Sequence, residues 1–185
     1  MSRVADLRPD QLSAEQNRIY EEIAAPRAGV VRGPFAVWLR TPKIADAANR
    51  LGNSVRVEGK IDRRLLELAV LIVARHWNAE YVWFVHEKEG LEAGLSKDVI
   101  DAVSRNWEPK FSRSDEKVVY DIVTELHQTR TVGPISYKRA VAALGLEPFI
   151  ELITAIGFYT TAAMMINAFD VPVPEGARPL LSHGR

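Results

Sequence analysis

One stretch decides the fold of this chain: Leu65-Leu66-Glu67-Leu68-Ala69-Val70-Leu71-Ile72-Val73-Ala74. Every residue in it except Glu67 is apolar, so a helix built from it carries apolar side chains on nearly every face. Such a helix needs packing partners on all sides, which predicts a central, buried position. Asp62 precedes the stretch at the place of a helix N-terminal cap. The stretch therefore predicts the central helix of an all-helical protein.

Start and stop signals predict further helices on both sides of this stretch. Ser13 and Gln16 have the spacing of a capping box, and Thr41 precedes a proline at a favoured helix start. Gly94 and Gly145 stand where helices commonly end. We expect an all-α, single-domain bundle of about seven or eight helices, with no strand. The expected helices cover residues 13–25, 41–58, 62–74, 79–93, 96–104, 114–128, 136–144 and 148–168.

The chain has the length and composition of one domain. It has 185 residues, of which 47% are hydrophobic and 26% charged, and it contains no low-complexity segment or linker. We expect one domain over residues 1–185 with its core between about residues 13 and 170. From Val171 the sequence is rich in proline, which predicts an extended C-terminal arm over residues 171–185.

Charge and hydropathy exclude several partners. The formal net charge is 0, so the chain lacks the basic surface of a nucleic-acid-binding protein. The longest apolar run, Leu68 to Ala74, is too short to span a membrane, and the N-terminus has no apolar run typical of a signal peptide. We therefore expect a cytoplasmic protein that binds neither nucleic acid nor membranes.

The absence of cysteine removes a group of chemistries. The chain has no cysteine, which excludes disulfides, thiolate metal sites and cysteine nucleophiles. Its four histidines are not at metal-ligand spacings, so no metal site is predicted. The sequence also lacks a glycine-rich phosphate loop, a nucleophile elbow and a dinucleotide-binding fingerprint.

Glu67 is the most informative single residue. A buried carboxylate must find a cation, accept hydrogen bonds or stay protonated with a raised pKa. A structural ion pair with Arg63, Arg64 or Arg75 would satisfy it without any catalytic role. The alternative is a functional partner on another helix.

His86 is the candidate for that partner. It follows Ala79 and Val82 at helical spacing, so its imidazole lies on a partly apolar face. A histidine in this setting is commonly a core residue whose ring nitrogens are hydrogen-bonded within the protein. If Glu67 lies opposite, however, the two side chains form a general acid/base pair.

These residues also carry a resemblance to a known family. The segments Arg64 to Leu68, Glu80 to Trp83 and Glu92 to Ser96, with His86 between the last two, resemble the signature of the carboxymuconolactone decarboxylase family. This family lies in the alkylhydroperoxidase D-like superfamily. The preceding Gly33-Pro34-Phe35 and the later stretch from Gly157 to Pro172 are similar to it as well, so the resemblance covers about residues 33–174.

The resemblance implies a change of chemistry within the superfamily. The peroxidase branch carries two cysteines between its glutamate and its histidine, and these positions fall on Ala79 and Val82 here. Thiol peroxidase chemistry needs a sulfenate and then a disulfide, which this chain cannot form. The resemblance instead implies a cofactor-independent acid/base enzyme, of the decarboxylase or lyase type, acting on a small organic acid or lactone.

The resemblance also implies roles for individual residues. Glu67 and His86 would be the acid/base pair, with Tyr81 as a hydrogen-bond donor to developing negative charge. Trp83 and Trp38 would form apolar walls. Arg75, Arg40 and Arg64 are the candidates to bind a substrate carboxylate, and the sequence does not choose among them.

Two further expectations remain open. Relatives with this signature assemble into dimers, trimers or hexamers, and the near-zero net charge favours self-association, so a homo-oligomer is expected. The alternative to an enzyme is a non-catalytic member that binds a small apolar ligand or acts as an oligomeric scaffold. That alternative predicts Glu67 locked in an arginine pair, with no cavity beside His86.

Overall fold

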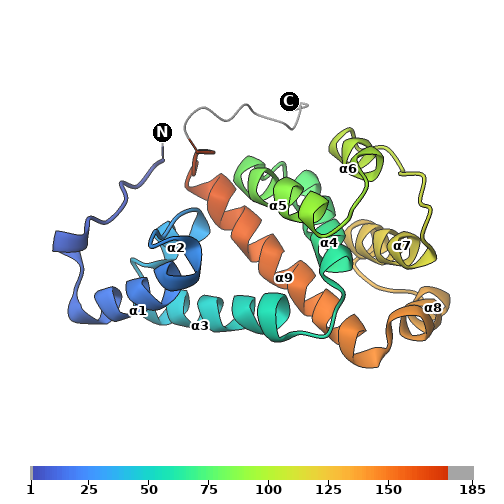
Figure 1. The fold of residues 1–185 in the computed structure, drawn as a ribbon, viewed down its shortest axis with the longest axis horizontal. Coiled ribbons are helices and arrows are strands. Elements are labelled where there is room, and N and C mark those ends of the chain that lie inside the picture. The colour runs from blue at the N-terminus through green and yellow to red at the C-terminus, as the bar shows by residue number, and fades with distance from the viewer. Residues whose placement is uncertain (1, 175–185) are drawn as a thin grey trace.

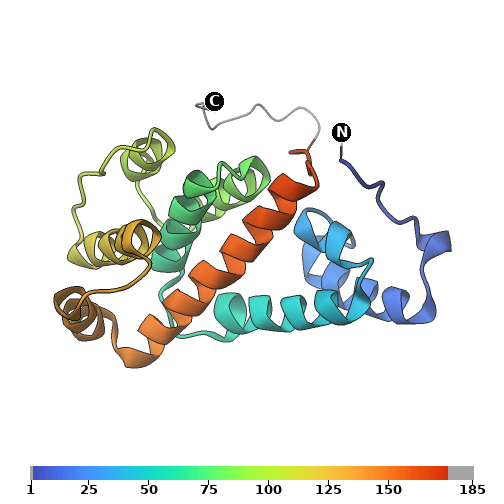
Figure 2. The same cartoon turned by 180° about the vertical axis from the view of Figure 1, so that it is seen from behind.

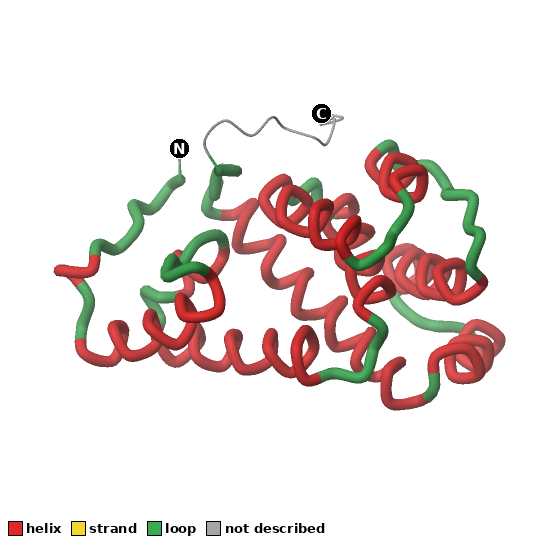
Figure 3. The backbone as a smooth tube through the Cα atoms, viewed as in Figure 1, coloured by secondary structure: helices red, strands yellow, loops and turns green. Residues whose placement is uncertain are grey.

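The computed structural model describes residues 2–174, and every described residue is in a helix or a loop (Figure 3). The all-helical prediction is therefore confirmed. Most of the expected C-terminal arm, residues 175–185, lies outside the described residues. The described α-helices are α1 (Ala14–Ala24), α2 (Pro34–Trp38), α3 (Pro42–Asn53), α4 (Arg63–His76), α5 (Glu80–Glu92), α6 (Lys97–Ser104), α7 (Ser114–Thr129), α8 (Pro134–Leu144) and α9 (Leu146–Ala168).

Two groups of helices flank the long helix α9. Figures 1 and 2 show α1, α2 and α3 on one side of α9, and α4 to α8 on the other. Helix α4 packs against α5, α7 and α9, while α9 itself contacts α2, α3, α5 and α8 as well. Helices α4 and α9 are therefore the two central elements of the bundle.

Helix α4 occupies the buried position that its sequence predicts. All residues from Arg64 to Ala74 are buried, and Leu68, Leu71, Val73 and Ala74 are fully excluded from solvent. Each fully buried leucine or valine contributes roughly 1.5–3 kcal/mol relative to an exposed one. The Asp62 side chain caps the helix by accepting hydrogen bonds from the backbone N–H groups of Arg64 (3.0 Å) and Leu65 (3.3 Å).

Helix α9 has the length and composition of a helix that could cross a membrane. Its most apolar window has a mean hydropathy of 1.6, and 50% of that window is buried inside the protein. Ala155, Ala162 and Ala163 are small residues on its buried face. Its place between the two helix groups accounts for this composition, since a central helix needs apolar side chains on several faces.

The helix boundaries differ from the predicted ones at three places. Helix α2 was not predicted, because a five-residue helix gives no periodic signal. The segment predicted to be α-helical up to residue 58 ends at Asn53 and continues as a π-helical turn, Ser54–Glu58. Helices α8 and α9 each begin two residues earlier than expected. The capping box at Ser13 and Gln16 is confirmed by both of its hydrogen bonds.

Charged contacts fix the neighbours of α4. Glu151, on α9, accepts hydrogen bonds from the backbone N–H groups of Lys60 and Ile61, both at 2.8 Å, and so holds the loop that leads into α4. Arg64, on α4, is buried and pairs with Glu116 (2.6 Å) and Asp115 (2.7 Å), at the start of α7. These contacts tie α4 and its leading loop to α7 and α9.

Candidate active site

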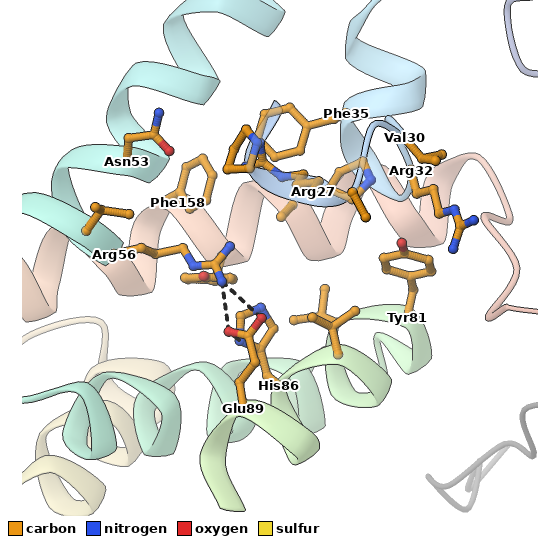
Figure 4. Close-up of a pocket in the computed structure, with 18 of the residues that line it drawn as sticks. Arg27, Val30, Arg32, Phe35, Asn53, Arg56, Tyr81, His86, Glu89 and Phe158 are labelled. Atoms are coloured by element: carbon orange, nitrogen blue, oxygen red, sulfur yellow. Dashed lines mark hydrogen bonds and ion pairs between the residues drawn. The ribbon is translucent and has the colours of Figure 1, made fainter. Parts of the chain in front are cut away.

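A cavity of about 560 Å³ lies where α5, α9 and the end of α3 meet the segment that precedes α2. In Figure 4, Arg27, Val30, Arg32 and Phe35 form one wall, while Tyr81, His86 and Glu89 rise from α5 on the other. Phe158 of α9 and Arg56 of the π-helical turn complete the cavity. Chain segments far apart in sequence therefore build one site.

Glu67 and His86 lie in direct contact at the base of this cavity. His86 Nδ1 is 2.6 Å from Glu67 Oε2, and the two side chains are 6% and 0% exposed. His86 lines the cavity, whereas Glu67 lies behind it without reaching the cavity surface. The carboxylate fixes the orientation of the imidazole, since Nδ1–H donates to it and Nε2 is left for another partner. Among the described residues, Nε2 has no hydrogen-bond partner.

Two arginines and a second carboxylate extend this pair into an ionic network. Arg63 Nη2 lies 2.8 Å from the other oxygen of Glu67, one helical turn away, without the angles of a hydrogen bond. Arg63 also pairs with Glu89. Arg56 donates to both oxygens of Glu89, at 2.8 and 3.1 Å (dashed in Figure 4). The network therefore contains two guanidiniums, two carboxylates and one imidazole.

The network keeps Glu67 ionised despite its burial. Burial raises the pKa of Glu67, but the hydrogen bond and charge of His86 and the charges of Arg63 and Arg56 together outweigh it. The pKa of Glu67 is consequently held below its ordinary range. An ionised Glu67 can stabilise the imidazolium form of His86 when that ring takes up a proton.

Tyr159, on α9, packs against the other side of His86. The two rings meet edge to face with their centroids 4.9 Å apart. The phenol oxygen is buried and, within the described part of the chain, has no hydrogen-bond partner. Burial raises the pKa of Tyr159 strongly, the charge of Arg56 opposes this shift, and the charges of Glu67 and Glu89 add to it. Tyr159 is therefore a neutral phenol that restricts the motion of the imidazole.

Tyr81 lines the cavity at the end that Arg32 occupies (Figure 4). Burial raises its pKa, and the charges of Arg32 and Arg27 act in the opposite direction. Its ring lies against Gly33, where an added Cβ atom would stand 2.5 Å from Tyr81 Cε1. Gly33 also has a φ of 63°, a conformation that glycine adopts without strain. Tyr81 and His86 thus line the same cavity.

The structure does not bring the three predicted substrate-binding residues to this cavity. Trp83 is 1% exposed in the core, and Trp38 packs behind Phe35 and Phe158, whose rings reach the cavity in its place. Arg75 hydrogen-bonds to Asn78 and lines a different cavity, of about 280 Å³, with His76 and His127.

The two other candidate arginines are also engaged elsewhere. Arg40 donates to the backbone oxygen of Ala5 (2.6 Å), and Arg64 is paired with α7 as described above. The arginines that line the cavity are Arg27, Arg32, Arg56 and Arg63. The sequence indicated only Arg63, through its spacing from Glu67. Arg27 ends a short 3-10 helix, Ala25–Arg27, whereas Arg32 stands in the loop before α2 and Arg56 in the π-helical turn. In such short segments no periodicity reveals the direction of a side chain.

Glu67, His86 and Glu89 also bring three potential metal ligands together. One ligand atom from each lies within 4.8 Å of the other two. Both carboxylates already pair with the guanidiniums of Arg63 and Arg56, so a cation would have to displace these charges. The donor set therefore fits an ionic network better than a resident metal ion.

Comparison with known proteins identifies the fold. No family model matches the sequence, and no curated protein matches it either. Among solved structures, an uncharacterised peroxidase-related protein from a Silicibacter species superposes with a TM-score of 0.75 at 11% identity, over 92% of this chain and 91% of that one.

A second solved structure gives the same assignment. A protein of unknown function from Agrobacterium tumefaciens, whose suggested role is antioxidant defence of the AhpD kind, superposes with a TM-score of 0.63 at 20% identity, over 75% of this chain and 95% of that one. The chain therefore has the helical fold of AhpD-like, peroxidase-related proteins. At these identities, the comparisons establish the fold and leave the chemistry to be inferred from the site.

Proposed function

We propose that this protein is a cofactor-independent enzyme that uses His86 as a general acid/base on a small organic acid or lactone. The 2.6 Å contact between His86 Nδ1 and Glu67, at the base of the cavity, carries this proposal. A histidine with one nitrogen fixed by a carboxylate and the other open to a cavity has the geometry of a proton-transfer catalyst. Proton transfer by this pair needs no additional group.

A decarboxylation illustrates what the pair can do. The bond between the carboxyl group and the neighbouring carbon breaks, CO2 leaves, and the electron pair stays on the substrate as an enolate or dienolate. The imidazolium form of His86 then gives its Nε2 proton to a substrate carbon and is reprotonated from solvent. Ionised Glu67 stabilises the imidazolium throughout. The guanidiniums at the cavity wall favour an anionic substrate and a developing negative charge.

Thiol peroxidase activity is not proposed, although both structural neighbours have peroxidase or antioxidant descriptions. The chain contains no cysteine, and thiol-disulfide peroxidase chemistry cannot proceed without sulfur. Val82 lines the cavity and Ala79 is fully buried at the start of α5. These are the two positions that the resemblance assigns to the thiols, and apolar side chains fill both.

One contact supports a second candidate function. Arg63 pairs with Glu67, as a purely structural role for that glutamate would require. The non-catalytic alternative, a small-ligand-binding or scaffold protein, is therefore retained. It predicted no cavity beside His86, however, and the cavity is present. The presence of the cavity favours the enzyme.

The test is turnover of a panel of small lactones and carboxylic acids, with release of CO2 and loss of substrate as the readouts. Glu67→Gln and His86→Gln each keep a polar side chain of similar size. We expect either change to lower kcat by roughly 10²–10⁴-fold while the protein stays folded. His76→Gln, an exposed position outside the cavity, is the matched control. Turnover that survives in both site variants would contradict the proposal, and binding without turnover in the natural protein would favour the alternative.

A further inference from the structure

Of the four arginines that line the cavity, two form ion pairs with carboxylates of the described residues and two do not. Arg56 and Arg63 pair with Glu89, and Arg63 also with Glu67. In the part of the chain that the structure describes, no carboxylate forms an ion pair with Arg27 or Arg32. The cavity therefore retains an excess of positive charge on the wall opposite His86.

Arg27 is held in place by neutral groups. Its Nη1 atom donates to the backbone oxygen of Ile23 (2.6 Å) and to Asn49 Oδ1 (3.4 Å), and its guanidinium lies over the Phe35 ring, 4.7 Å from the centroid. Burial and then the charge of Arg56 lower the pKa of Arg27, and the charge of Glu89 acts in the opposite direction. A partly buried, oriented cation without an ion-pair partner has lost hydration that no ion pair replaces, so an anion bound there would stabilise it.

The space between Arg27 and His86 is bounded mainly by apolar side chains. Val82 and Val85 contribute from α5, and Phe158 and Ala162 from α9. In Figure 4 Phe158 lies on the same side of the cavity as Arg27 and Phe35. A ligand that spans this space needs an apolar body, with an anionic group at one end only.

We infer that the cavity binds an amphipathic organic carboxylate, with its carboxylate on Arg27 and its apolar part lying along Val82 and Phe158 toward His86. Arg32, at the same wall, adds positive charge that attracts the anion. In this arrangement the bound carboxylate is separated from the proton-transfer group. As a statement about substrate class, this rests on the proposed function, whereas the binding site itself does not.

Calorimetric titration of the full chain tests the inference without a known substrate. The probes are benzoate and 3-phenylpropanoate, each compared with its neutral amide. We expect each carboxylate to bind at least about tenfold more tightly than its amide, because a charge-assisted bond to Arg27 replaces a neutral one. The advantage should shrink at high salt, because Arg27 is only partly buried. Equal affinities of acid and amide for the natural protein would overturn the inference.

Substitution of Arg27 then locates the carboxylate. Arg27→Gln should weaken carboxylate binding by about tenfold or more and leave amide binding within about twofold. Arg27→Lys, which keeps the charge without the fork of donors, should lie in between. Arg18→Gln is the matched control, since Arg18 is exposed on α1, pairs with Glu22 and does not line the cavity. Unchanged carboxylate affinity in Arg27→Gln would overturn the assignment. If that variant does not fold, Arg27→Lys decides the question, because affinity equal to that of the natural protein would likewise overturn it.

Different results would contradict the proposed enzyme activity and the inferred carboxylate site. Absence of turnover in the natural protein would contradict the enzyme but leave the acid-against-amide comparison intact. Unchanged binding in Arg27→Gln would contradict this inference but leave the effects of Glu67→Gln and His86→Gln on turnover intact.

Discussion

At the scale of single residues, the site contains buried polar groups that have a hydrogen-bond or ion-pair partner and others that have none within residues 2–174. Glu67 has no exposed surface, yet it contacts both His86 and Arg63. Removing either partner would leave a buried charge incompletely paired, which is commonly costly. The Tyr159 hydroxyl is the opposite case, because it is buried without a partner among the described residues.

Tyr159→Phe should leave the free energy of unfolding unchanged or raise it by up to about 1 kcal/mol. The change removes an oxygen whose desolvation is uncompensated, and it keeps the ring that packs on His86. Urea titration measures the effect, with Tyr137→Phe, at a half-exposed position on α8, as the control. A loss of more than about 1 kcal/mol would show that the hydroxyl has a partner in solution, such as a bound water.

His127 predicts a pH dependence of stability. Burial, and then the charge of neighbouring His76, lower the pKa of His127 to about 4, below the roughly 6.5 of an unfolded chain. The unfolded state therefore binds the proton first, and stability falls as the pH drops from about 6.5 to 4. His127→Gln should reduce this fall. The urea midpoints of both proteins at pH 7 and pH 5 measure it, and an equal fall in the two would contradict the prediction.

At the scale of elements, short irregular segments position the cavity wall, and long helices position its base. Helices α4 and α5 carry Glu67 and His86. The sequence indicates the start of α4 at Asp62, the end of α5 at Gly94 and the apolar residues of both helices. The opposite wall comes from the 3-10 helix Ala25–Arg27, the loop before α2 and the π-helical turn after α3. These segments place Arg27 and Arg56, which no sequence pattern indicated.

Gly33→Ala should destabilise the protein by roughly 1–3 kcal/mol and alter the cavity mouth. The positive φ of Gly33 is unfavourable for alanine, and the new Cβ would collide with the Tyr81 ring. Gly157→Ala is the matched control, because Gly157 is an exposed helical position with open space around its Cβ. We expect that control to be neutral or stabilising. Thermal unfolding compares the two, and equal midpoints would argue against the strain at Gly33.

At the scale of the whole molecule, the surface leaves several large apolar side chains exposed. Ile135 is 83% exposed and Val57 77%, and Ile44 and Ile150 are also more than half exposed. With a formal net charge of 0, such a surface favours self-association. We expect a homo-oligomer, which size-exclusion chromatography with light scattering would detect. A monomer at micromolar concentration would contradict this expectation.

The sequence predicted the all-helical bundle because helices give local, periodic signals. The lone carboxylate in an apolar helix indicated that Glu67 needs a partner, and the sequence left open whether that partner is an arginine or His86. The structure gives Glu67 both Arg63 and His86. Arg75, Trp38 and Trp83 were assigned to substrate binding from residue type alone. Residue type does not show which face of the bundle a side chain reaches, and these three lie behind or away from the cavity. Tyr159 and Arg27 depend on contacts between distant segments, which only the folded chain reveals.

The π-helical turn Ser54–Glu58 makes the cavity sensitive to the number of residues as well as to their type. A π-turn contains one residue more than an α-turn. In an α-helix each residue advances the chain by about 100° around the axis. Loss of a single residue here would therefore rotate Arg56 away from Glu89 and leave Arg63 as the remaining arginine paired with that carboxylate. A one-residue deletion would thus break one ion pair of the site while leaving every ionisable side chain in the protein.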